Sequence, residues 1–344
     1  MKTEMKKILL SLLSVAVLFI LGYGIIVAYS LLGEQFNNKE TDYLYIYPAD
    51  NVKTLKQKIT SVASPSSMAG FDLAARTLDI SGKMKAGRYE VRPSMNMLTL
   101  LRNIRNHVQT PVNLIVPSVR TVQTMAGKLS ERLMVDSAAL ASLLTDSAAC
   151  ANLGYTRETV PALFIPNTYQ VYWDITAGQL LERMQKENAA FWNEQRQAKA
   201  RQIGMSREEI VTLASIVDSE TTNNAEKPRI AGLYLNRLKA NMLLQSDPTV
   251  IFAVGDFTIR RVLRKHLDVD SPYNTYKYKG LPPGPIRIPS VVGIDAVLNH
   301  ETHNYLYMCA KEDFSGTHNF AATYAEHQQN ARRYIRALDK KGIK

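Results

Sequence analysis

The sequence has 344 residues, of which 46% are hydrophobic and 21% are charged. It is therefore long enough for two or three domains and too apolar for a disordered protein. The formal charge of +11 favours an anionic partner, which composition leaves open between nucleic acid, anionic lipid and an anionic polymer. The sequence contains no basic run with interleaved aromatic residues, so we expect no nucleic-acid partner.

The first predicted element is a long apolar helix. Residues 8 to 33 carry no charge, which is enough chain to cross a bilayer. We expect a retained membrane anchor. A cleaved signal peptide is the alternative, because Ala28-Tyr29-Ser30 is a weak cleavage pattern, although such peptides usually have apolar regions of roughly 7 to 15 residues.

Lysines before this span predict its orientation. Lys2, Lys6 and Lys7 precede the apolar stretch. By the positive-inside rule, the N-terminus then lies in the cytoplasm. We therefore expect a single-pass protein of the plasma (inner) membrane, with the bulk of the chain on the periplasmic or extracytoplasmic side.

The segment after the apolar helix predicts a small mixed unit. Residues 43–47 read as a strand, and Asn51 can cap a helix over 52–62. A second helix fits residues 67–78, and a strand with a turn at Gly87 follows. This order of strand, helix, helix and strand resembles a LysM-like βααβ module, although many α+β fragments share the outline.

The rest of the chain becomes increasingly helical. A helix over 95–106, a strand over 112–116 and a helix over 121–133 precede a strongly helical region that starts near residue 177. We expect an α+β fold in four parts: a cytoplasmic tip with a transmembrane helix over 1–35, a LysM-like domain over 36–110, a connecting α/β region over 111–176, and a mostly helical domain over 177–344.

One predicted helix carries a carboxylate on its apolar side. A capping box at Ser206 and Glu209 marks its start. At about 100° per residue, Glu220 falls inside the apolar arc, whereas Asp218 falls just outside it. A carboxyl against apolar surroundings has a raised pKa, as a general acid requires. The alternative is that the helix ends near Asp218 and that Glu220 caps it or pairs with Lys227 or Arg229.

The cysteines and histidines suggest two other kinds of site, a disulfide bond and a zinc site. Cys150 and Cys309 could pair in an oxidising compartment, but we favour two separate small buried residues. His300-Glu301-Thr302-His303 places its histidines three positions apart, whereas the HExxH zinc motif requires four. We therefore expect no metal and no cofactor.

Two downstream stretches are rich in turn residues and hydrogen-bonding side chains. They are LLQSDPTVIF (243–252) and SPYNTYKYKGLPPGPIRIPS (271–290). Prolines make the second stretch stiff and poor in N–H donors. Stiff loops with Tyr, Asn and Gln suit sugar recognition, and a rigid surface connection is the alternative.

Taken together, these motifs resemble a known family. The ordered series LASIVDSET, LNRL, LQSDPTV, YNTY, GLPPGPI and HNF is similar to the YceG-like (MltG) family of endolytic murein transglycosylases. The catalytic segment of that family resembles Ala-Ser-Ile-x-x-x-Glu, which places its glutamate at Glu220. The chain departs from the family at Asp218, where a glutamate is common, and at Asn167, where an aspartate is common.

The resemblance implies a reaction and a set of site residues. A lytic transglycosylase cleaves the bond between N-acetylmuramic acid and N-acetylglucosamine in peptidoglycan strands without water. It leaves 1,6-anhydromuramic ends and so terminates or trims new strands. Glu220 would first protonate the glycosidic oxygen and then accept the proton of the C6 hydroxyl, within a cleft of a catalytic domain over 177–344. The expected substrate-binding residues are Gln245, Asp247, Thr249, Tyr273, Asn274 and Thr275, with Glu226 and His318 as further candidates.

The resemblance also implies partners. They are glycan strands and peptidoglycan synthases of the penicillin-binding type, while the lipid bilayer is expected as a partner from the N-terminal anchor. A wall-binding scaffold without catalysis remains the alternative, because an anchor, a LysM-like region and positive charge would suffice for it. Glu220 together with the cleft motifs favours the enzyme.

Overall fold

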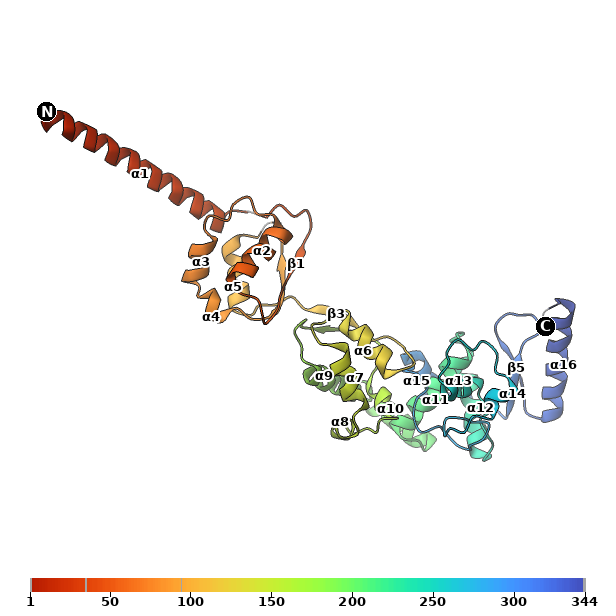
Figure 1. The fold of residues 1–344 in the computed structure, drawn as a ribbon. Helices are drawn as coiled ribbons and strands as arrows, with labels where there is room; N and C mark the ends of the chain where they lie inside the picture. The colour runs from red at the N-terminus through yellow and green to blue at the C-terminus, as the bar shows by residue number, and fades with distance from the viewer. Residues whose placement is uncertain (1, 35, 94, 343–344) are drawn as a thin grey trace. The chain divides into compact units, whose positions relative to one another are not determined.

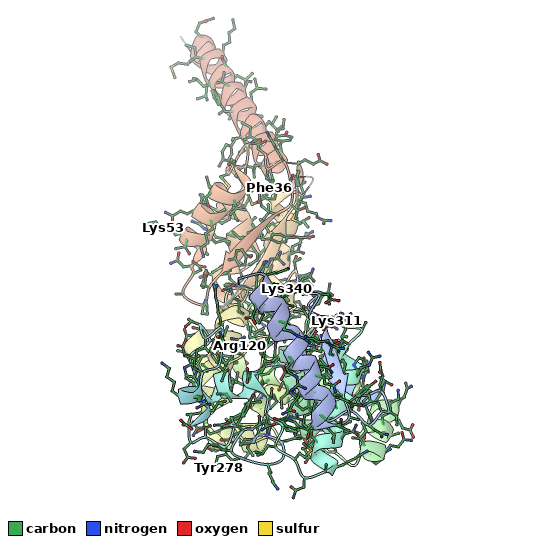
Figure 2. The ribbon with its side chains drawn as sticks, turned by 90° about the vertical axis from the view of Figure 1, so that its right-hand side faces the viewer. Phe36, Lys53, Arg120, Tyr278, Lys311 and Lys340 are labelled. Atoms are coloured by element: carbon green, nitrogen blue, oxygen red, sulfur yellow. The ribbon has the colours of Figure 1, made fainter. Side chains whose placement is uncertain are left out.

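The computed structural model describes residues 2–34, 36–93 and 95–342, and they form a mixed fold of helices and small sheets (Figure 1). The chain divides into two compact units. The first comprises residues 1–113 and 170–175, and the second comprises residues 114–169 and 176–344. Figure 2 labels Phe36 and Lys53 in the first unit, and Arg120, Tyr278, Lys311 and Lys340 in the second.

The apolar N-terminal segment is a single helix, α1 (Lys2–Leu32). Its stretch Glu4–Leu32 has a mean hydropathy of 2.6 over the most apolar window, and none of that window is buried. By length and composition α1 can therefore cross a membrane. A signal sequence would have the same properties.

The remainder of the first unit follows the predicted order of elements. It consists of β1 (Asp42–Ile46), α2 (Val52–Ala63), α3 (Phe71–Thr77), a one-turn α4 (Ile80–Lys83), β2 (Gly87–Val91) and α5 (Met97–Arg105). Strands β1 and β2 pair antiparallel, with Asp42 opposite Val91 and Ile46 opposite Gly87. The Asn51 side chain accepts hydrogen bonds from the N–H groups of Lys53 and Thr54, as predicted for a cap. The second predicted helix begins at Phe71, four residues later than expected.

Alternating side chains of the two strands build the core of this unit. Leu44, Ile46, Tyr89 and Val91 point inward and are at most 1% exposed. They pack with apolar residues of α2 to α5, including Leu55, Ile59, Ile80, Leu100 and Ile104. The antiparallel pair thus has one face on a core, the usual arrangement for a short sheet covered by helices.

The second unit is mostly helical. Strand β3 (Val112–Ile115) pairs with β4 (Thr168–Val171), and the division between the units falls within both strands. Strand β5 (Tyr307–Ala310) pairs antiparallel with β6 (His318–Ala321). The helices are α6 (Val122–Ser130), α7 (Ser137–Thr145), α8 (Ser147–Asn152), the 3₁₀ turn η1 (Val160–Leu163), α9 (Ala177–Phe191), α10 (Glu194–Ile203), α11 (Arg207–Glu220), α12 (Lys227–Lys239), α13 (Asp247–Val254), α14 (Arg264–Leu267), α15 (Val291–Leu298) and α16 (Tyr324–Lys340). Helix α16 packs on the β5–β6 hairpin, and Lys311 lies beside it in Figure 2.

Helix α11 is the centre of this unit. The predicted capping box forms, because Ser206 and Glu209 exchange side-chain to backbone hydrogen bonds. Helices α10, α12, α13 and α15 surround α11 (Figure 1), and every residue from Ile210 to Asp218 is buried. The helix therefore has no solvated face along this stretch, and its last residue, Glu220, emerges from a packed core.

Polar residues inside α11 are satisfied locally or by a crossing loop. Thr212 Oγ1 donates to the carbonyl of Glu208 at 2.7 Å. Ser215 Oγ donates to the carbonyl of Thr212 at 2.7 Å and accepts from the N–H of Ile286 at 3.0 Å. The proline-rich loop is thereby fixed against the middle of the helix, since a buried N–H without a partner would be costly.

Candidate functional site

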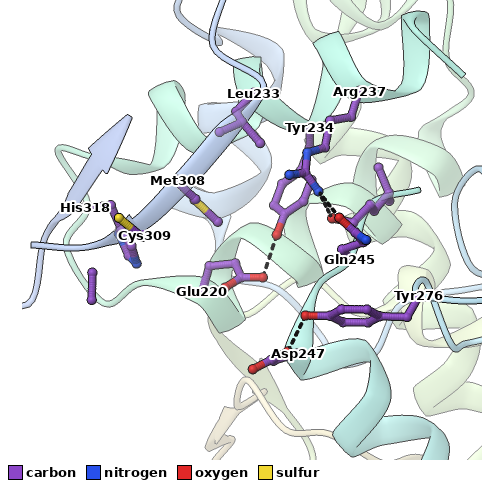
Figure 3. Close-up of a pocket in the computed structure, with 12 residues that line it drawn as sticks. Glu220, Leu233, Tyr234, Arg237, Gln245, Asp247, Tyr276, Met308, Cys309 and His318 are labelled. Atoms are coloured by element: carbon purple, nitrogen blue, oxygen red, sulfur yellow. Dashed lines mark hydrogen bonds between the residues drawn. The ribbon is translucent and has the colours of Figure 1, made fainter. Parts of the chain in front are cut away.

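A polar pocket opens at the C-terminal end of α11. Its cavity volume is about 290 Å³. Its walls come from α11, α12, the start of α13 with the residues before it, the loop at Tyr276, and the β5–β6 hairpin (Figure 3). The lining residues are Glu220, Leu233, Tyr234, Arg237, Leu244, Gln245, Asp247, Tyr276, Met308, Cys309, Ala310 and His318.

Glu220 is held in this pocket through one carboxyl oxygen. Tyr234 Oη donates to Glu220 Oε1 at 2.6 Å, and Ser246 Oγ donates to the same oxygen at 2.5 Å (Figure 3 shows the tyrosine bond). Among the described residues, none donates a hydrogen bond to Oε2. The carboxyl group is thus fixed in position and keeps Oε2 for a ligand.

The surroundings of Glu220 favour its protonated form. Burial is the largest influence and raises the pKa of Glu220. The hydrogen bonds from Ser246 and Tyr234 lower the pKa, the charge of Asp247 raises it, and His318 lowers it, with a net shift upward. Burial and the nearby Glu220 charge also raise the pKa of Tyr234, so its phenol stays a donor. Glu220 can therefore retain a proton at higher pH than an ordinary glutamate.

Asp247 and Gln245 lie on the other side of Glu220 from the β5–β6 hairpin (Figure 3). Asp247 opens α13 and accepts from Tyr276 Oη at 2.7 Å through Oδ1. Gln245 has a φ of 51°. This angle lies in the left-handed region, which residues other than Gly, Asn and Asp seldom adopt. Two hydrogen bonds hold this strained backbone in place. Arg237 donates to the Gln245 side chain at 3.5 Å, and the N–H of Gln245 donates to the carbonyl of Thr275.

Four of the predicted substrate-binding residues lie behind the pocket and position its walls. Asn274 donates to the carbonyls of Leu267 and Val269, both at 2.8 Å, and is fully buried. Thr275 accepts from the N–H of Ser246 at 3.0 Å and bonds Thr249 at 2.7 Å. Tyr273 packs on Phe252 with ring centroids 4.7 Å apart. Thr249, Tyr273, Asn274 and Thr275 are not among the lining residues, so in this structure they fix the two loops that carry Ser246 and Tyr276.

Glu226 and His318 form a pair at the opposite wall. Glu226 Oε2 bonds His318 Nδ1 at 2.9 Å, and Glu226 Oε1 accepts from the backbone N–H of His318 at 2.8 Å. Glu226 is only 7% exposed, whereas His318 lines the pocket. The structure thus brings Glu220, Gln245, Asp247 and His318 to one cavity, with Glu226 directly behind it.

Periodicity placed Asp218 just outside the apolar arc and Glu220 inside it, but Asp218 is the more buried of the two acids. Its side chain is 5% exposed and pairs with Lys227 Nζ at 2.7 Å. It also accepts from the N–H of Ser290 at 2.5 Å. The reason is that α11 is surrounded by other helices, so residues outside the apolar arc are buried as well. Neither suggested cation pairs with Glu220, because Lys227 binds Asp218 and Arg229 binds Glu301.

The two cysteines are separate, as favoured from the sequence, but only Cys150 is buried and Cys309 is partly exposed. Both thiols are free. Cys150 is buried in α8, and Cys309 lies on β5 in the pocket wall. Burial raises the pKa of both thiols.

Sequence reasoning missed the groups that hold Glu220. Ser246 lies between Gln245 and Asp247 in a motif already singled out, but its role depends on how the loop folds back onto α11. Tyr234 lies on α12, and only the pairing of α11 with α12 brings its hydroxyl to Glu220. Arg237, in the pocket wall, belongs to the LNRL motif, but the motif alone assigned no role to its side chain.

Comparisons with known proteins agree on one family. The sequence model of the YceG-like family matches residues 44–333. A protein named endolytic murein transglycosylase from Bacillus subtilis (strain 168) is 41% identical over 137 residues, covering 40% of this chain and 37% of that protein. A protein of the same name from Streptococcus pneumoniae (strain ATCC BAA-255 / R6) is 26% identical over 286 residues, covering 73% of this chain and 51% of that protein. The matches thus span about half the length of these curated relatives, or less.

A solved structure supports the same assignment. The crystal structure of a yceG-like protein from Listeria monocytogenes superposes with a TM-score of 0.56 at 27% sequence identity. The match covers 85% of this chain and 99% of that one.

We predict that Tyr234→Phe raises the pKa of Glu220 further. The substitution removes a donor that favours the charged carboxylate while burial is unchanged. The measurement is a carbon-13 NMR titration of glutamate carboxyls, with Glu220→Gln to assign the signal. Tyr155→Phe, which removes a phenol that bonds Asn188, is the control and should leave the titration unchanged. An unchanged or lower pKa of Glu220 in Tyr234→Phe would contradict this assignment.

We predict that Asp218→Asn destabilises the helical unit by about 3–5 kcal/mol, because it leaves the buried Lys227 ammonium without its carboxylate. Thermal and urea unfolding of the detergent-solubilised chain measure this loss. Glu131→Gln breaks the exposed pair with Lys128 and should change stability by less than about 1 kcal/mol. Equal stability of the two variants would show that the buried pair contributes nothing.

Proposed function

The chain belongs to the YceG-like family, and we propose that it is an endolytic murein transglycosylase. Its substrate would be the glycan strands of peptidoglycan, cut at internal bonds between N-acetylmuramic acid and N-acetylglucosamine. The observation that carries this proposal is the carboxyl group of Glu220, which has a raised pKa and one oxygen held by two hydroxyl donors in a polar pocket. The names of the relatives from Bacillus and Streptococcus are consistent with it.

In this proposal Glu220 is the general acid. The Oε2 oxygen, which no described residue engages, carries the proton toward the glycosidic oxygen. As the bond from C1 of the muramic sugar to that oxygen breaks, the oxygen takes the proton and leaves as the hydroxyl of the next sugar. The two donors on Oε1 stabilise the carboxylate that forms. The C6 hydroxyl of the muramic sugar attacks C1 and gives its proton to a base in the pocket, and the product end is a 1,6-anhydro sugar.

An intramolecular nucleophile reduces what the protein must supply. The attacking hydroxyl belongs to the same sugar, so no water has to be bound and oriented. The protein needs an acid, a proton acceptor and walls that hold the ring. Gln245, Asp247 and Tyr276 are the wall residues placed to donate or accept hydrogen bonds. Cleavage of new strands in this way would trim or terminate them.

A glycoside hydrolase is the second candidate, because Asp247 lies in the same pocket as Glu220. A hydrolase requires a second carboxylate that activates water or attacks C1 directly. Tyr276 donates to Asp247 Oδ1 at 2.7 Å, which ties one oxygen of that carboxylate to the pocket wall. We favour the transglycosylase, for which a single protein carboxyl is sufficient.

The first unit supports a supplementary role. We propose that residues 36–110 form a LysM-like module that contacts glycan, and that α1 anchors the protein in the membrane. The positive lysines before the apolar stretch support an N-terminus in the cytoplasm and a catalytic domain on the other side of the membrane. Peptidoglycan synthases would be partners at that location.

We predict that Glu220→Gln lowers the rate of strand cleavage by roughly 100- to 10,000-fold, because the amide cannot donate a proton. The assay counts new ends in purified glycan strands incubated with the detergent-solubilised chain. Glu209→Gln on the same helix is the matched control, since a glutamine can keep the capping box. Binding of strands to Glu220→Gln should persist. Cleavage by this variant at the wild-type rate would favour a wall-binding or otherwise different role for the pocket.

We predict that protease added to intact spheroplasts degrades the part of the chain after residue 40. This outcome follows from the predicted orientation of α1. A marker fused before Lys2 should remain protected in the same cells. Protection of the large C-terminal part, or a mature protein that starts after Ser30, would exclude the proposed topology.

A further inference from the structure

Glu226 and His318 are joined by two hydrogen bonds, which is more than a packing contact between two side chains requires. Both oxygens of Glu226 are used by one residue, since Oε1 accepts the backbone N–H of His318 and Oε2 bonds its ring Nδ1. The glutamate is the residue before α12 and is only 7% exposed. It stands at the N-terminal end of that helix, where the helix dipole is positive. The imidazole ring is therefore fixed in both place and rotation.

This arrangement also selects the tautomer of the ring. An ionised carboxylate only accepts hydrogen bonds, so the proton of the neutral imidazole lies on Nδ1. The lone pair is then on Nε2. His318 lines the pocket and its side chain is 17% exposed, so Nε2 is the ring atom left for a ligand. A buried carboxylate on Nδ1 orients the imidazole and determines which ring nitrogen is offered to the pocket.

His318 and Glu220 face the same cavity from different walls. Figure 3 shows His318 on the hairpin side of Glu220, with Asp247 and Gln245 on the other side. A charge on His318 is close enough to influence Glu220. A sugar ring bound over Glu220 Oε2 would thus lie between an acid and a nitrogen base.

We propose that His318, oriented by Glu226, is the general base that accepts the proton of the attacking C6 hydroxyl, so that acid and base are different residues. This inference rests on the proposed function. In the step, the C6 oxygen forms a bond to C1 while its proton moves to Nε2 of His318. The bond from C1 to the leaving oxygen breaks, and that oxygen takes the proton of Glu220. The resulting imidazolium pairs with Glu226, and the proton returns to Glu220 before the next cycle.

The charged groups around His318 are compatible with this role. Glu226 stabilises the imidazolium, and Lys311 on the same hairpin opposes it but pairs with Asp313 at 3.0 Å. Burial keeps the neighbouring Cys309 as a neutral thiol, because the pKa of that thiol is raised. The carboxyl groups that face His318 are thus Glu226, which bonds its ring, and Glu220, which lines the same pocket.

The test compares three variants of the full chain in detergent, assayed on purified glycan strands. His318→Asn keeps a donor that can reach Glu226 but has no base in the pocket, and we expect roughly a 100- to 10,000-fold loss of turnover with strand binding retained. His318→Ala should regain activity in proportion to added imidazole. Glu226→Gln should shift the acidic limb of the pH–rate profile to lower pH, because the imidazolium loses its counter-ion. His300→Asn, whose ring bonds the carbonyl of Val297, is the control.

Two results would overturn the inference without affecting the proposed function. One is a His318→Asn variant within about threefold of the wild-type rate. The other is a loss in His318→Ala that imidazole does not restore, together with an acidic limb that does not move in Glu226→Gln. In both cases the proposed function would still be supported, provided that the wild-type chain cleaves strands and Glu220→Gln does not. Failure of the wild-type chain to cut strands would instead reject the proposed function itself.

Discussion

The carboxyl group of Glu220, held through Oε1 by Tyr234 and Ser246, is the interaction on which the rest of the site depends. These hydrogen bonds form because α11 is packed on all sides from Ile210 to Asp218, and its last residue, Glu220, lies in a polar cavity. Burial alone would leave a costly carboxylate. Two hydroxyl donors make the charged form tolerable, so the group can both lose and regain a proton.

The neighbouring loops serve that interaction. Ser246 reaches Glu220 because Thr275 accepts its backbone N–H and Thr249 bonds Thr275. Asn274 closes the second loop through two backbone carbonyls, which places Tyr276 opposite Asp247. The left-handed backbone at Gln245 is the strained point of this assembly. Some residues that resemble ligand contacts in the sequence, such as Thr249 and Asn274, therefore hold the loops of the pocket wall in this structure.

Local signals predicted what depends on local chemistry. The Asn51 cap predicted α2, the capping box at Ser206 with the apolar spacing predicted α11, and residues 43–47 read as the strand that became β1. They also singled out Glu220. The same periodicity failed for Asp218, because it assumes a solvated face that a surrounded helix does not have. Tyr234, and the pairing of Glu226 with His318 across 92 residues, depend on tertiary contacts that no local pattern encodes.

The central claim is that one protein carboxyl starts a cleavage that consumes no water. The most direct measurement is mass analysis of new glycan ends made by the purified chain in water labelled with heavy oxygen. The account predicts 1,6-anhydromuramic ends without the label, made by wild-type protein and not by Glu220→Gln. Reducing ends that carry the label would show that water is the nucleophile, with Asp247 as the group placed to activate it, and would contradict the account.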